Sequence, residues 1–333
     1  MSSFLRFARG ANYKRFESEL KKIAAEKKRS VAGLKADFMR CFVLYGTGLT
    51  DYLNYKFYDR SSRERKEYVT IRIQDRVYPR INPDQYKKVF SEKFRFLRAF
   101  GKYAGRDWFY AEEDTADNLR AFLSRHSVFM EKPCDGLGGA GVHKVRSDEI
   151  GDVEEYYGKL KASRSLLEEL IVQHEKMSSF SPSSVNTVRV MTATGPEDTE
   201  IIFACVRIGR GGDVDNFHAG GMCALVDVET GVIKGNAIAK DGTEYKTHPV
   251  SGVRFDGFQI PNWDKVRNIC LEAAKIEPRI HTVGWDVAVT EEGAVFVEGN
   301  RRAGFDLVQM SSRRGRKDVL KRAVDISGVK VKI

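Results

Sequence analysis

The sequence predicts an α+β protein in which N-terminal helices precede mostly antiparallel sheets. Residues 13–40 repeat apolar side chains at the spacing of an amphipathic helix, and residues 51–100 continue with dense charge and many aromatic side chains. From about residue 127 this pattern gives way to short runs rich in β-branched residues. Strand runs combined with a few long helices are typical of α+β proteins. A chain of 333 residues is long enough for about two domains with a sizeable core.

Each element is predicted from its own local pattern. The apolar residues at helical spacing in the first segment are Phe16, Leu20, Ile23 and Ala24. Pro261 precedes an apolar pattern that predicts a helix over 262–276, and a last helix is expected over about 305–325. The runs predicted as strands cover residues 127–133, 141–145, 165–172, 186–194, 200–208, 223–238, 283–290 and 294–300.

The composition excludes several classes of protein. No apolar run approaches the roughly 18 residues needed to cross a membrane, and the first residues lack the apolar core of a secretory signal. The five cysteines are scattered without a C-x-x-C pair, which argues against a disulfide framework or a zinc ribbon and fits a reduced cytosol. We therefore expect a cytoplasmic globular protein.

The positive charge is concentrated at the N-terminal end. Residues 1–100 carry 24 Lys and Arg against 11 Asp and Glu, whereas residues 101–333 carry 32 against 35. A solvated helical face explains this excess, and so does contact with an acidic partner, an acidic polymer or an anionic membrane surface. Nucleic acid is not expected, because we find no zinc-finger or RNP-like motif and no regular interleaving of aromatic residues with basic ones.

A glycine-rich loop between two strands is the first segment that carries chemistry. It lies within residues 128–145, where Lys132 ends the first strand. Glycines allow backbone N–H groups to approach an anion without obstruction by a Cβ atom, and Lys132 adds a cation at the same place. The glycines of the loop are Gly136, Gly138, Gly139 and Gly141. The loop is predicted to close over phosphates, and a flexible hairpin tip is the alternative.

A β-hairpin over residues 284–300 is the second such segment. A three-residue loop at 291–293, with its glycine in the left-handed conformation, places Asp286 opposite Glu298 and returns Asn300 to the same face. A loop of two or four residues would put the two carboxylates on opposite faces. Opposed like charges need neutralisation, and two carboxylates with an amide oxygen suit Mg²⁺. A solvent-facing acidic hairpin is the alternative, and loss of either carboxylate is expected to leave the fold intact.

The third segment, residues 166–175, is an apolar strand that carries two acidic residues and then turns polar; an edge strand explains it equally well.

The order of the three segments resembles the ATP-grasp superfamily. Residues 183–189 and 214–221 are similar to its sugar-transfer-associated branch, which is found among polysaccharide-biosynthesis functions. Residues 91–96 resemble the helix that carries the family's other phosphate-binding lysine. The resemblance covers roughly residues 90–312.

The resemblance implies an ATP-grasp fold, in which two α+β subdomains grip ATP, with ATP and Mg²⁺ as cofactors. The expected divisions are a basic helical region at 1–90, a lid subdomain at 91–165 and a C-terminal subdomain at 166–333. Phosphate contacts are implied for Lys93, Lys132, Gly138, Gly139 and Gly141. Adenine and ribose contacts are implied for main-chain atoms around Glu169 and Ile171, with Glu168 nearby, and for Glu175 or His174. The implied metal ligands are Asp286, Glu298 and Asn300.

One position departs from the pattern of related ligases. They often carry an arginine two residues before the first metal-binding aspartate, where it steadies an oxyanion, and Gly284 occupies that position here. We therefore expect Arg189, Arg207 or Arg302 to take this role. His218 is a candidate acid or base, although a lone histidine is more often structural.

The function implied by the resemblance is ATP-dependent ligation of a carboxylate to an amine through an acyl phosphate. The carboxylate is expected on a sugar acid, an amino acid or a small peptide. A phosphotransferase that uses the same ATP site and a non-catalytic adaptor that docks through its basic helices are the alternatives. Residues 1–90 are expected to form helices that cover the cleft and help to bind an anionic acceptor, such as an acidic carbohydrate. The sequence does not indicate the oligomeric state.

Overall fold

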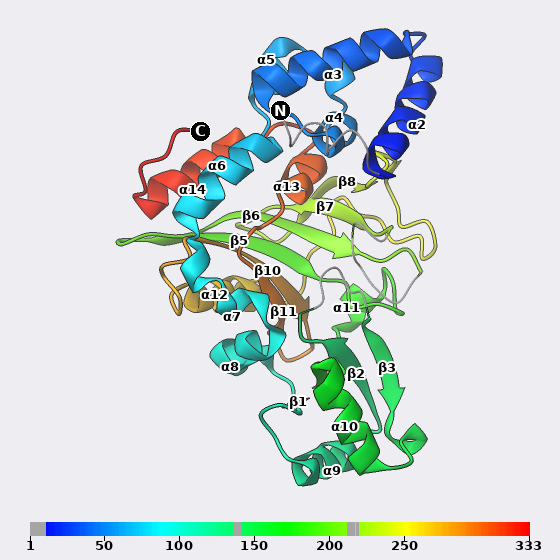
Figure 1. Cartoon of the computed structure of the whole chain (residues 1–333), viewed down its shortest axis with the longest axis vertical. Helices are drawn as coiled ribbons and strands as arrows, with labels where there is room; N and C mark the ends of the chain where they lie inside the picture. Colours follow the sequence, from blue (N-terminus) through cyan, green and yellow to red (C-terminus); the bar gives the residue numbers. More distant parts are fainter. Residues whose placement is uncertain (1–10, 136–140, 212–216, 218–219) are drawn as a thin grey trace.

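The computed structural model describes residues 11–135, 141–211, 217 and 220–333, and it shows the α+β architecture that the sequence predicts. N-terminal helices, a seven-stranded sheet and a four-stranded sheet follow one another along the long axis of the molecule (Figure 1). All described pairs of neighbouring strands in both sheets are antiparallel.

The seven-stranded sheet has the strand order β11-β10-β5-β6-β7-β8-β9. Its strands are β5 (Val188–Thr194), β6 (Thr199–Ile208), β7 (Met222–Val226), β8 (Ile233–Ala239), β9 (Glu244–Tyr245), β10 (Thr282–Val289) and β11 (Ala294–Asn300). The short strand β9 has no counterpart among the predicted runs, because two residues carry no detectable alternation.

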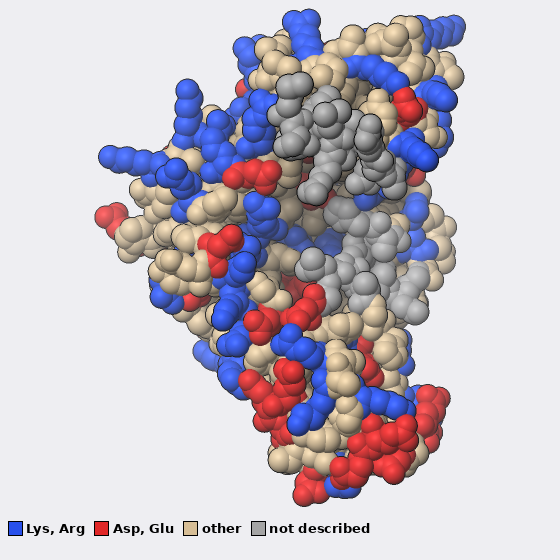
Figure 2. Space-filling view, viewed as in Figure 1, with Lys and Arg blue, Asp and Glu red and all other residues tan. Residues whose placement is uncertain are grey.

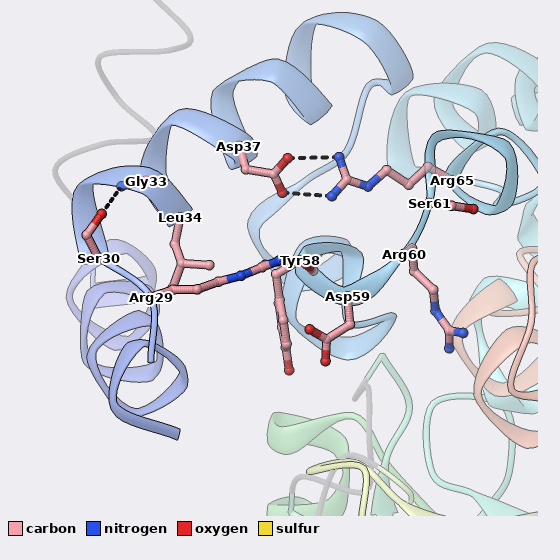
Figure 3. A pocket seen from close by; sticks show the side chains of 10 residues that line it. All are labelled: Arg29, Ser30, Gly33, Leu34, Asp37, Tyr58, Asp59, Arg60, Ser61 and Arg65. Atoms are coloured by element: carbon pink, nitrogen blue, oxygen red, sulfur yellow. Dashed lines mark hydrogen bonds and ion pairs between the residues drawn. The ribbon is translucent and has the colours of Figure 1, made fainter. Parts of the chain in front are cut away.

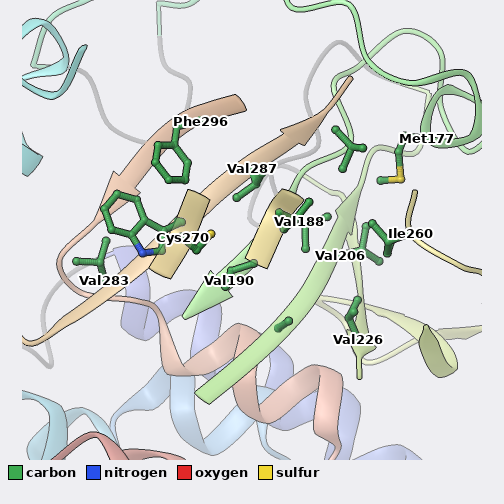
Figure 4. Packing of buried hydrophobic residues seen from close by; sticks show 14 of the residues in the cluster. Met177, Val188, Val190, Val206, Val226, Ile260, Cys270, Val283, Val287 and Phe296 are labelled. Carbon is green, nitrogen blue, oxygen red and sulfur yellow. The ribbon is translucent and has the colours of Figure 1, made fainter. Parts of the chain in front are cut away.

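Both faces of this sheet are covered, because side chains alternate between the faces along each strand. Val188 and Val190 of β5 point into a core formed with α8 (Lys93–Ala104) and α12 (Trp263–Ala274), part of which Figure 4 shows. Met191 of β5 points into a second core on the other face, together with the N-terminal helices and the C-terminal helices. The intervening Arg189 shares that second face, which therefore carries the polar residues discussed below.

The four-stranded sheet has the order β1-β4-β2-β3. Its elements are β1 (Trp108–Tyr110), β2 (Val128–Pro133), β3 (His143–Arg146), β4 (Ser165–Glu169), α9 (Ala116–Arg125) and α10 (Val153–Ser163). Phe122 of α9 and Leu160 of α10 pack with Phe129 in a small separate core. The expected boundary at residue 165 falls at the start of β4, so we propose to move it to the end of that strand.

The N-terminal region is helical, as expected, throughout its described part. Its elements are α2 (Ala11–Glu26), α3 (Val31–Tyr45), α4 (Leu49–Asn54), α5 (Ser62–Lys66), α6 (Ile71–Ile81) and α7 (Lys88–Ser91), with 3₁₀ turns at Phe57–Asp59 and Asp84–Tyr86. The remaining elements are a 3₁₀ turn at Ser147–Glu149 and the helices α11 (Glu175–Ser178), α13 (Phe305–Ser312) and α14 (Lys317–Ser327).

The segment with a helical pattern over 13–40 and the helix predicted over about 305–325 are each interrupted once. Residues 13–40 contain α2 and most of α3, with Lys28 between them at a φ of 52°. Residues 305–325 contain α13 and most of α14, with Arg313 between them at a φ of 56°. A left-handed residue ends the helical hydrogen-bond ladder. A residue outside this segment stabilises the break at Arg313, because the Arg313 guanidinium bonds to Glu244 of β9 at 2.8 Å.

The N-terminal helices share a core with the seven-stranded sheet. The rings of Phe16, Phe38 and Tyr52 contact one another, with centroid separations of 4.9 Å between the two phenylalanines and 5.4 Å between Phe38 and Tyr52. The same cluster contains Met191 and Phe203 from the sheet. The helical region is thus packed onto the sheet face opposite α8 and α12.

Charge is distributed unevenly over the visible surface. Lys and Arg side chains are prominent over the N-terminal helices, whereas Asp and Glu gather at the opposite end of the molecule around α9 and α10 (Figure 2). Within the described part of the chain, no helix combines the length and the apolar character required to cross a bilayer.

An ion pair joins α3 to α5 inside the helical region (Figure 3). Arg65 donates from two nitrogens to the carboxylate of Asp37 at 2.8 and 2.9 Å, and it also bonds to the carbonyl oxygen of Phe57. The Arg65 side chain is 10% exposed and that of Asp37 is 27% exposed. Tyr52 donates to the same carboxylate at 2.9 Å. The pair therefore connects α3, α4, α5 and the 3₁₀ turn at Phe57–Asp59.

We expect Arg65→Met to lower the free energy of unfolding by about 3 kcal/mol, because it removes one partner of a largely buried charge pair and leaves Asp37 uncompensated. Arg63→Met is the matched control on the same short helix, where the side chain is exposed and has no described ion-pair partner. Urea unfolding followed by circular dichroism measures both variants. Equal stability of the two variants would show that the Arg65 pair contributes nothing.

Candidate active site

The hairpin pairs Asp286 with Glu298 as predicted, but through a different turn. Backbone bonds between Thr290 and Gly293 at 2.9 and 3.3 Å close a two-residue loop, and Gly293 is not left-handed. Such a loop alone would put the two carboxylates on opposite faces. A β-bulge at Val297 inserts one extra residue into β11 and restores the pairing of Asp286 with Glu298. The predicted three-residue loop is therefore wrong, and the predicted pair is confirmed.

Arg106 lies at this bulge and was not found from the sequence. Its guanidinium donates to the carbonyl oxygens of Phe296 and Val297, the second at 3.4 Å, and to the carboxylate of Glu168 at 2.5 Å. The side chain is 2% exposed. Because Glu168 belongs to β4 and the two carbonyls belong to β11, Arg106 joins the two sheets. No local pattern marks this residue, since its partners are far away in the sequence.

Asp286 is a buried carboxylate held by two arginines. Arg189 of the neighbouring strand β5 bonds to both carboxylate oxygens, and Arg207 of β6 bonds to one of them at 2.6 Å. Burial raises the pKa of Asp286, but the two guanidinium groups outweigh burial and hold the pKa below its ordinary value. The hairpin is therefore not a solvent-facing acidic hairpin. The arginines also change the expected outcome of losing Asp286, because that loss would remove the buried carboxylate to which both guanidinium groups bond.

Gly284 leaves room for the side chain of Arg189. A Cβ atom at Gly284 would lie 3.0 Å from the Cβ atom of Ala303 and 3.2 Å from Cδ of Arg189. Arg189 also donates to the carbonyl oxygen of Ala303 at 3.1 Å. The aliphatic part of Arg189 thus occupies the space that a side chain at position 284 would need. The departure from related ligases at this position coincides with a guanidinium supplied by the adjacent strand.

Glu298 and Asn300 complete the acidic group. The amide of Asn300 donates to Glu298 at 3.1 Å and to Asp286 at 3.4 Å. Burial and the neighbouring carboxylate of Asp286 raise the pKa of Glu298, so this carboxyl group lacks a cationic partner that fully compensates it. Among the described residues no group of three or more His, Cys, Asp and Glu side chains is arranged for a metal ion. The set here is two carboxylates and one amide, which are oxygen donors of the kind that Mg²⁺ prefers.

Lys132 and Glu168 form a buried ion pair at the end of β2. The distance from Nζ of Lys132 to the Glu168 carboxylate is 2.9 Å, and the Glu168 side chain is 3% exposed. Burial raises the pKa of Glu168, but the charges of Arg106 and Lys132 outweigh burial and lower the pKa to about 2. Glu168 thus stays ionised and orients Lys132. Its implied place near adenine stays a prediction.

Lys93 lies in the same charged region, at the first residue of α8. Its ammonium group donates to the carbonyl oxygen of Pro133 at 3.0 Å. Burial lowers its pKa, Glu298 opposes this effect and Lys132 adds to it. Lys93 is therefore within electrostatic reach of the second lysine and of the acidic group. The structure brings these predicted residues together from α8, β2 and β11.

The segment after β4 carries the residues expected near adenine. The backbone N–H of Glu169 donates to Asp107 at 2.9 Å, so this N–H already has a partner. Ile171 lies in the irregular stretch between β4 and α11. Within the described part of the chain its backbone N–H donates no hydrogen bond. A free N–H in an irregular stretch is compatible with contact to a base edge, and the contact itself stays a prediction.

The residues expected near the ribose lie at the tip of the β10–β11 hairpin. His174 is 3.3 Å from the carboxylate of Glu291, and the backbone N–H of Glu175 donates to the same carboxylate at 2.8 Å. These contacts tie the end of the segment after β4 to the hairpin loop. They place both residues beside the hairpin loop, whereas Asp286 lies further from the loop, within β10, where it pairs with Glu298.

Of the other predicted residues, Arg302 is separate from this group and Gly141 lies beside Pro133 at its edge. Arg302 forms an ion pair with Asp75 at 3.2 Å on the surface, where its side chain is 50% exposed. Gly141 has a φ of 74° and its position requires glycine, because a Cβ atom there would lie 2.8 Å from Cγ of Pro133. The remaining predicted residues, Gly136, Gly138, Gly139 and His218, lie outside the described part of the chain.

The chain matches one protein-family model and is similar to several solved structures. The model of the family described as sugar-transfer associated ATP-grasp matches residues 72–325. No curated protein matches the sequence. Among solved structures, the chain is similar to the ATP-grasp ligase PsnB, complexed with a phosphomimetic variant of a minimal precursor, Mg and ADP, at 14% identity and a TM-score of 0.44. That alignment covers 73% of this chain and 62% of PsnB, so the chain spans less than two thirds of the length of PsnB.

Two further structures show similar levels of likeness. D-cycloserine synthetase DcsG aligns at 12% identity and a TM-score of 0.44, over 74% of this chain and 74% of its own. N5-carboxyaminoimidazole synthetase from Staphylococcus aureus, complexed with ADP, aligns at 11% identity and a TM-score of 0.39, over 65% of this chain and 45% of its own.

Proposed function

The chain belongs to the sugar-transfer associated ATP-grasp family, and on this premise we propose that it is an ATP-dependent carboxylate–amine ligase. The reaction forms an amide and releases ADP and phosphate. The carboxylate belongs to a sugar acid, an amino acid or a small peptide, in polysaccharide or natural-product biosynthesis. The neighbouring ligases named above are distant, so this assignment depends on the chain's own residues.

One observation carries the proposal. Two lysines from the four-stranded sheet and α8 converge with the acidic group of the hairpin, and Arg106 holds the two sheets against each other at that point. Cations that face a buried carboxylate pair suit a triphosphate with its divalent ion, since phosphoryl transfer needs positioning and electrostatic stabilisation more than covalent chemistry. A protein that only docks to a partner has no need of such a group.

Each residue of the group has a defined task in this proposal. Lys93 and Lys132 neutralise phosphate oxygens, and Glu168 keeps Lys132 oriented. Asp286, Glu298 and Asn300 hold Mg²⁺, which neutralises charge on the phosphate oxygens when it is bound. Arg189 and Arg207 hold Asp286 in place, and in this location they are also the cations closest to the acidic pair. Arg207 contributes to the oxyanion role that an arginine at position 284 has in related ligases.

The chemistry proceeds in two steps. The terminal phosphoryl group moves from ATP to a carboxylate oxygen of the substrate, which gives an acyl phosphate and ADP. The nitrogen of the amine then attacks the acyl carbon, the bond from that carbon to the phosphate oxygen breaks, and the nitrogen loses a proton. An amide and inorganic phosphate result. Cations around the reacting centre stabilise the negative charge that develops on the acyl oxygen.

Product analysis tests the proposal. The protein is incubated with Mg²⁺, ATP and a panel of carboxylates paired with amines, and ADP, phosphate and product masses are measured. We expect ADP and phosphate in equal amounts, with a product whose mass is the sum of both substrates minus water. Hydroxylamine in place of the amine should trap the acyl phosphate as a hydroxamate. ADP without phosphate, with a stable phosphorylated product, would make the protein a phosphotransferase, and absence of Mg–ADP binding would make it an adaptor.

A further inference from the structure

A polar cavity lies between the N-terminal helices and the face of the seven-stranded sheet opposite α8 and α12. Its volume is about 810 Å³, within the range of about 300–1,000 Å³ that small-molecule sites occupy. Helix α2 forms one wall, α4 and the start of α6 form another, and the turn after β8 and the first turn of α13 close the base. The charged side chains of its lining include Arg15, Lys56, Arg210, Lys240, Asp241 and Asp306.

The cavity gathers cations that lack partners. Among the described residues, no ion pair or hydrogen bond is made by the side chains of Arg15, Lys56 and Lys240. Two other lysines of the same wall behave differently, because Lys22 pairs with Glu19 at 2.8 Å and Lys27 pairs with Asp59 at 2.8 Å. The cations without an ion pair among the described residues therefore lie around the turn after β8, which also carries Asp241.

These cations also face one another. Burial lowers the pKa of Lys240, and the nearby charge of Arg15 lowers it further, while Asp306 opposes both effects. Lys56 comes close to the same turn, because a Cβ atom at Gly242 would lie 3.1 Å from its Nζ atom. Asp306 near Lys240 and Glu244 near Lys56 offset part of the repulsion between these like charges, and a bound anion would relieve the rest.

The cavity is adjacent to the candidate active site. Asp306 lines it, and a Cβ atom at Gly304 would lie 3.0 Å from Oδ1 of Asp306 and 3.8 Å from Nη1 of Arg189. Arg189 in turn holds Asp286. The cations themselves are more distant, because β8 and β10 are four strands apart, about 19 Å at the backbone for strands about 4.8 Å apart. An anion among these cations is therefore not the group that reacts near Asp286.

We propose that this cavity binds the acceptor substrate through an anionic group, a carboxylate or a phosphate, that is remote from its reacting carboxylate. The inference rests on the proposed function for the identity of the reaction, but not for the presence of the anion site. Neutral polar residues of the walls, Thr50, Asn54 and Gln74, together with Asp241, suit the hydroxyl groups of a sugar. The acceptor is thus an extended, hydroxyl-rich anion.

Isothermal titration calorimetry with saturating Mg–ADP tests the anion site, because the nucleotide keeps phosphate compounds out of the ATP site. The probes are glucuronate for the carboxylate, glucose 6-phosphate for the phosphate and glucose as the neutral reference. We expect at least one of the two acids, glucuronate or glucose 6-phosphate, to bind at least tenfold more tightly than glucose. The acid that binds more tightly identifies the source of the negative charge.

A pair of double variants with the same net charge separates local contact from long-range attraction. Arg15→Gln with Lys240→Gln removes two cations of the cavity, whereas Lys14→Gln with Lys21→Gln removes two exposed cations of the same helix α2 that do not line it. We expect the first variant to weaken binding of the acid at least tenfold and the second to change it less than twofold. Unfolding midpoints of both variants are measured alongside.

Three results would overturn the anion site: no binding of either acid at 50 mM, binding of glucose as tight as that of the acids, or equal weakening by both double variants. Failure of the proposed function has a different signature. If Mg–ADP does not bind but the acids bind and respond to the cavity variant alone, the ligase assignment falls and the anion site stands.

Discussion

Asp286→Asn is expected to lower the free energy of unfolding by about 3–5 kcal/mol, because it removes the buried carboxylate to which both Arg189 and Arg207 bond. Their side chains are only 9% and 11% exposed, so water cannot replace the lost carboxylate. The same substitution removes a proposed metal ligand. Turnover should fall by about 10²–10³-fold, the scale seen when one electrostatic stabiliser of a transition state is lost.

Glu298→Gln is the matched variant at the opposite position of the hairpin. It removes a carboxyl group whose pKa is raised by burial and by repulsion from Asp286, and it retains an amide that can bond to Asn300. We expect stability to stay unchanged or to rise slightly, while turnover falls as far as it does for Asp286→Asn. The contrast in stability follows from the different partners of two carboxylates that face each other.

Denaturant unfolding and ATP-dependent phosphate release, measured on both variants, separate these effects. A Glu298→Gln protein with wild-type turnover would remove this residue from the metal site. An Asp286→Asn protein as stable as the wild type would show that the two arginines do not depend on the carboxylate. Activity is assayed well below the unfolding midpoint of the weaker variant, so that loss of folded protein does not imitate loss of catalysis.

Lys132→Ala is expected to weaken Mg–ATP binding by about 10–100-fold, the effect of losing one charged hydrogen bond worth about 1.5–3 kcal/mol. Lys144→Ala is the matched control. Lys144 lies on the adjacent strand β3, its side chain is exposed and it has no described ion-pair partner. The control should bind Mg–ATP as the wild type does. The stability of Lys132→Ala should change little, because Glu168 keeps Arg106 as a partner.

Nucleotide titration of both lysine variants gives the comparison. Equal losses would mean that the positive charge acts at long range and that Lys132 has no direct contact with phosphate. Repeating the titration at higher ionic strength provides a second check. A direct contact in a partly buried site should be less sensitive to salt than attraction by an exposed lysine.

Part of the site is readable from sequence because it depends on short-range patterns. The alternation along two neighbouring strands places Asp286 and Glu298 on one hairpin, and a resemblance to a known family points to Lys93 and Lys132. The turn is not readable in this way. Its two-residue loop shifts the register by one residue, and the bulge at Val297 shifts it back.

The bulge illustrates why local reasoning stops there. Carbonyl groups next to Val297 are bonded by Arg106, a residue distant in sequence that enters from the loop between α8 and β1. The same is true of Gly284, whose missing side chain makes room for Arg189 from another strand. Arg106 and Gly284 matter because of contacts with residues far away in the sequence. The residues next to them in the sequence therefore do not reveal their role.

The sequence by itself determined the helical N-terminal region, most strands of the seven-stranded sheet, the basic N-terminal third and the pair of carboxylates on the hairpin, since periodicity and charge patterns act over a few positions. Only the tertiary structure decided which arginines neutralise Asp286, how Glu168 orients Lys132 and where unpaired cations gather beside α2. These features depend on contacts between segments far apart in the chain. Their energies come from burial and charge pairing, which exist only after the sheets and helices have packed.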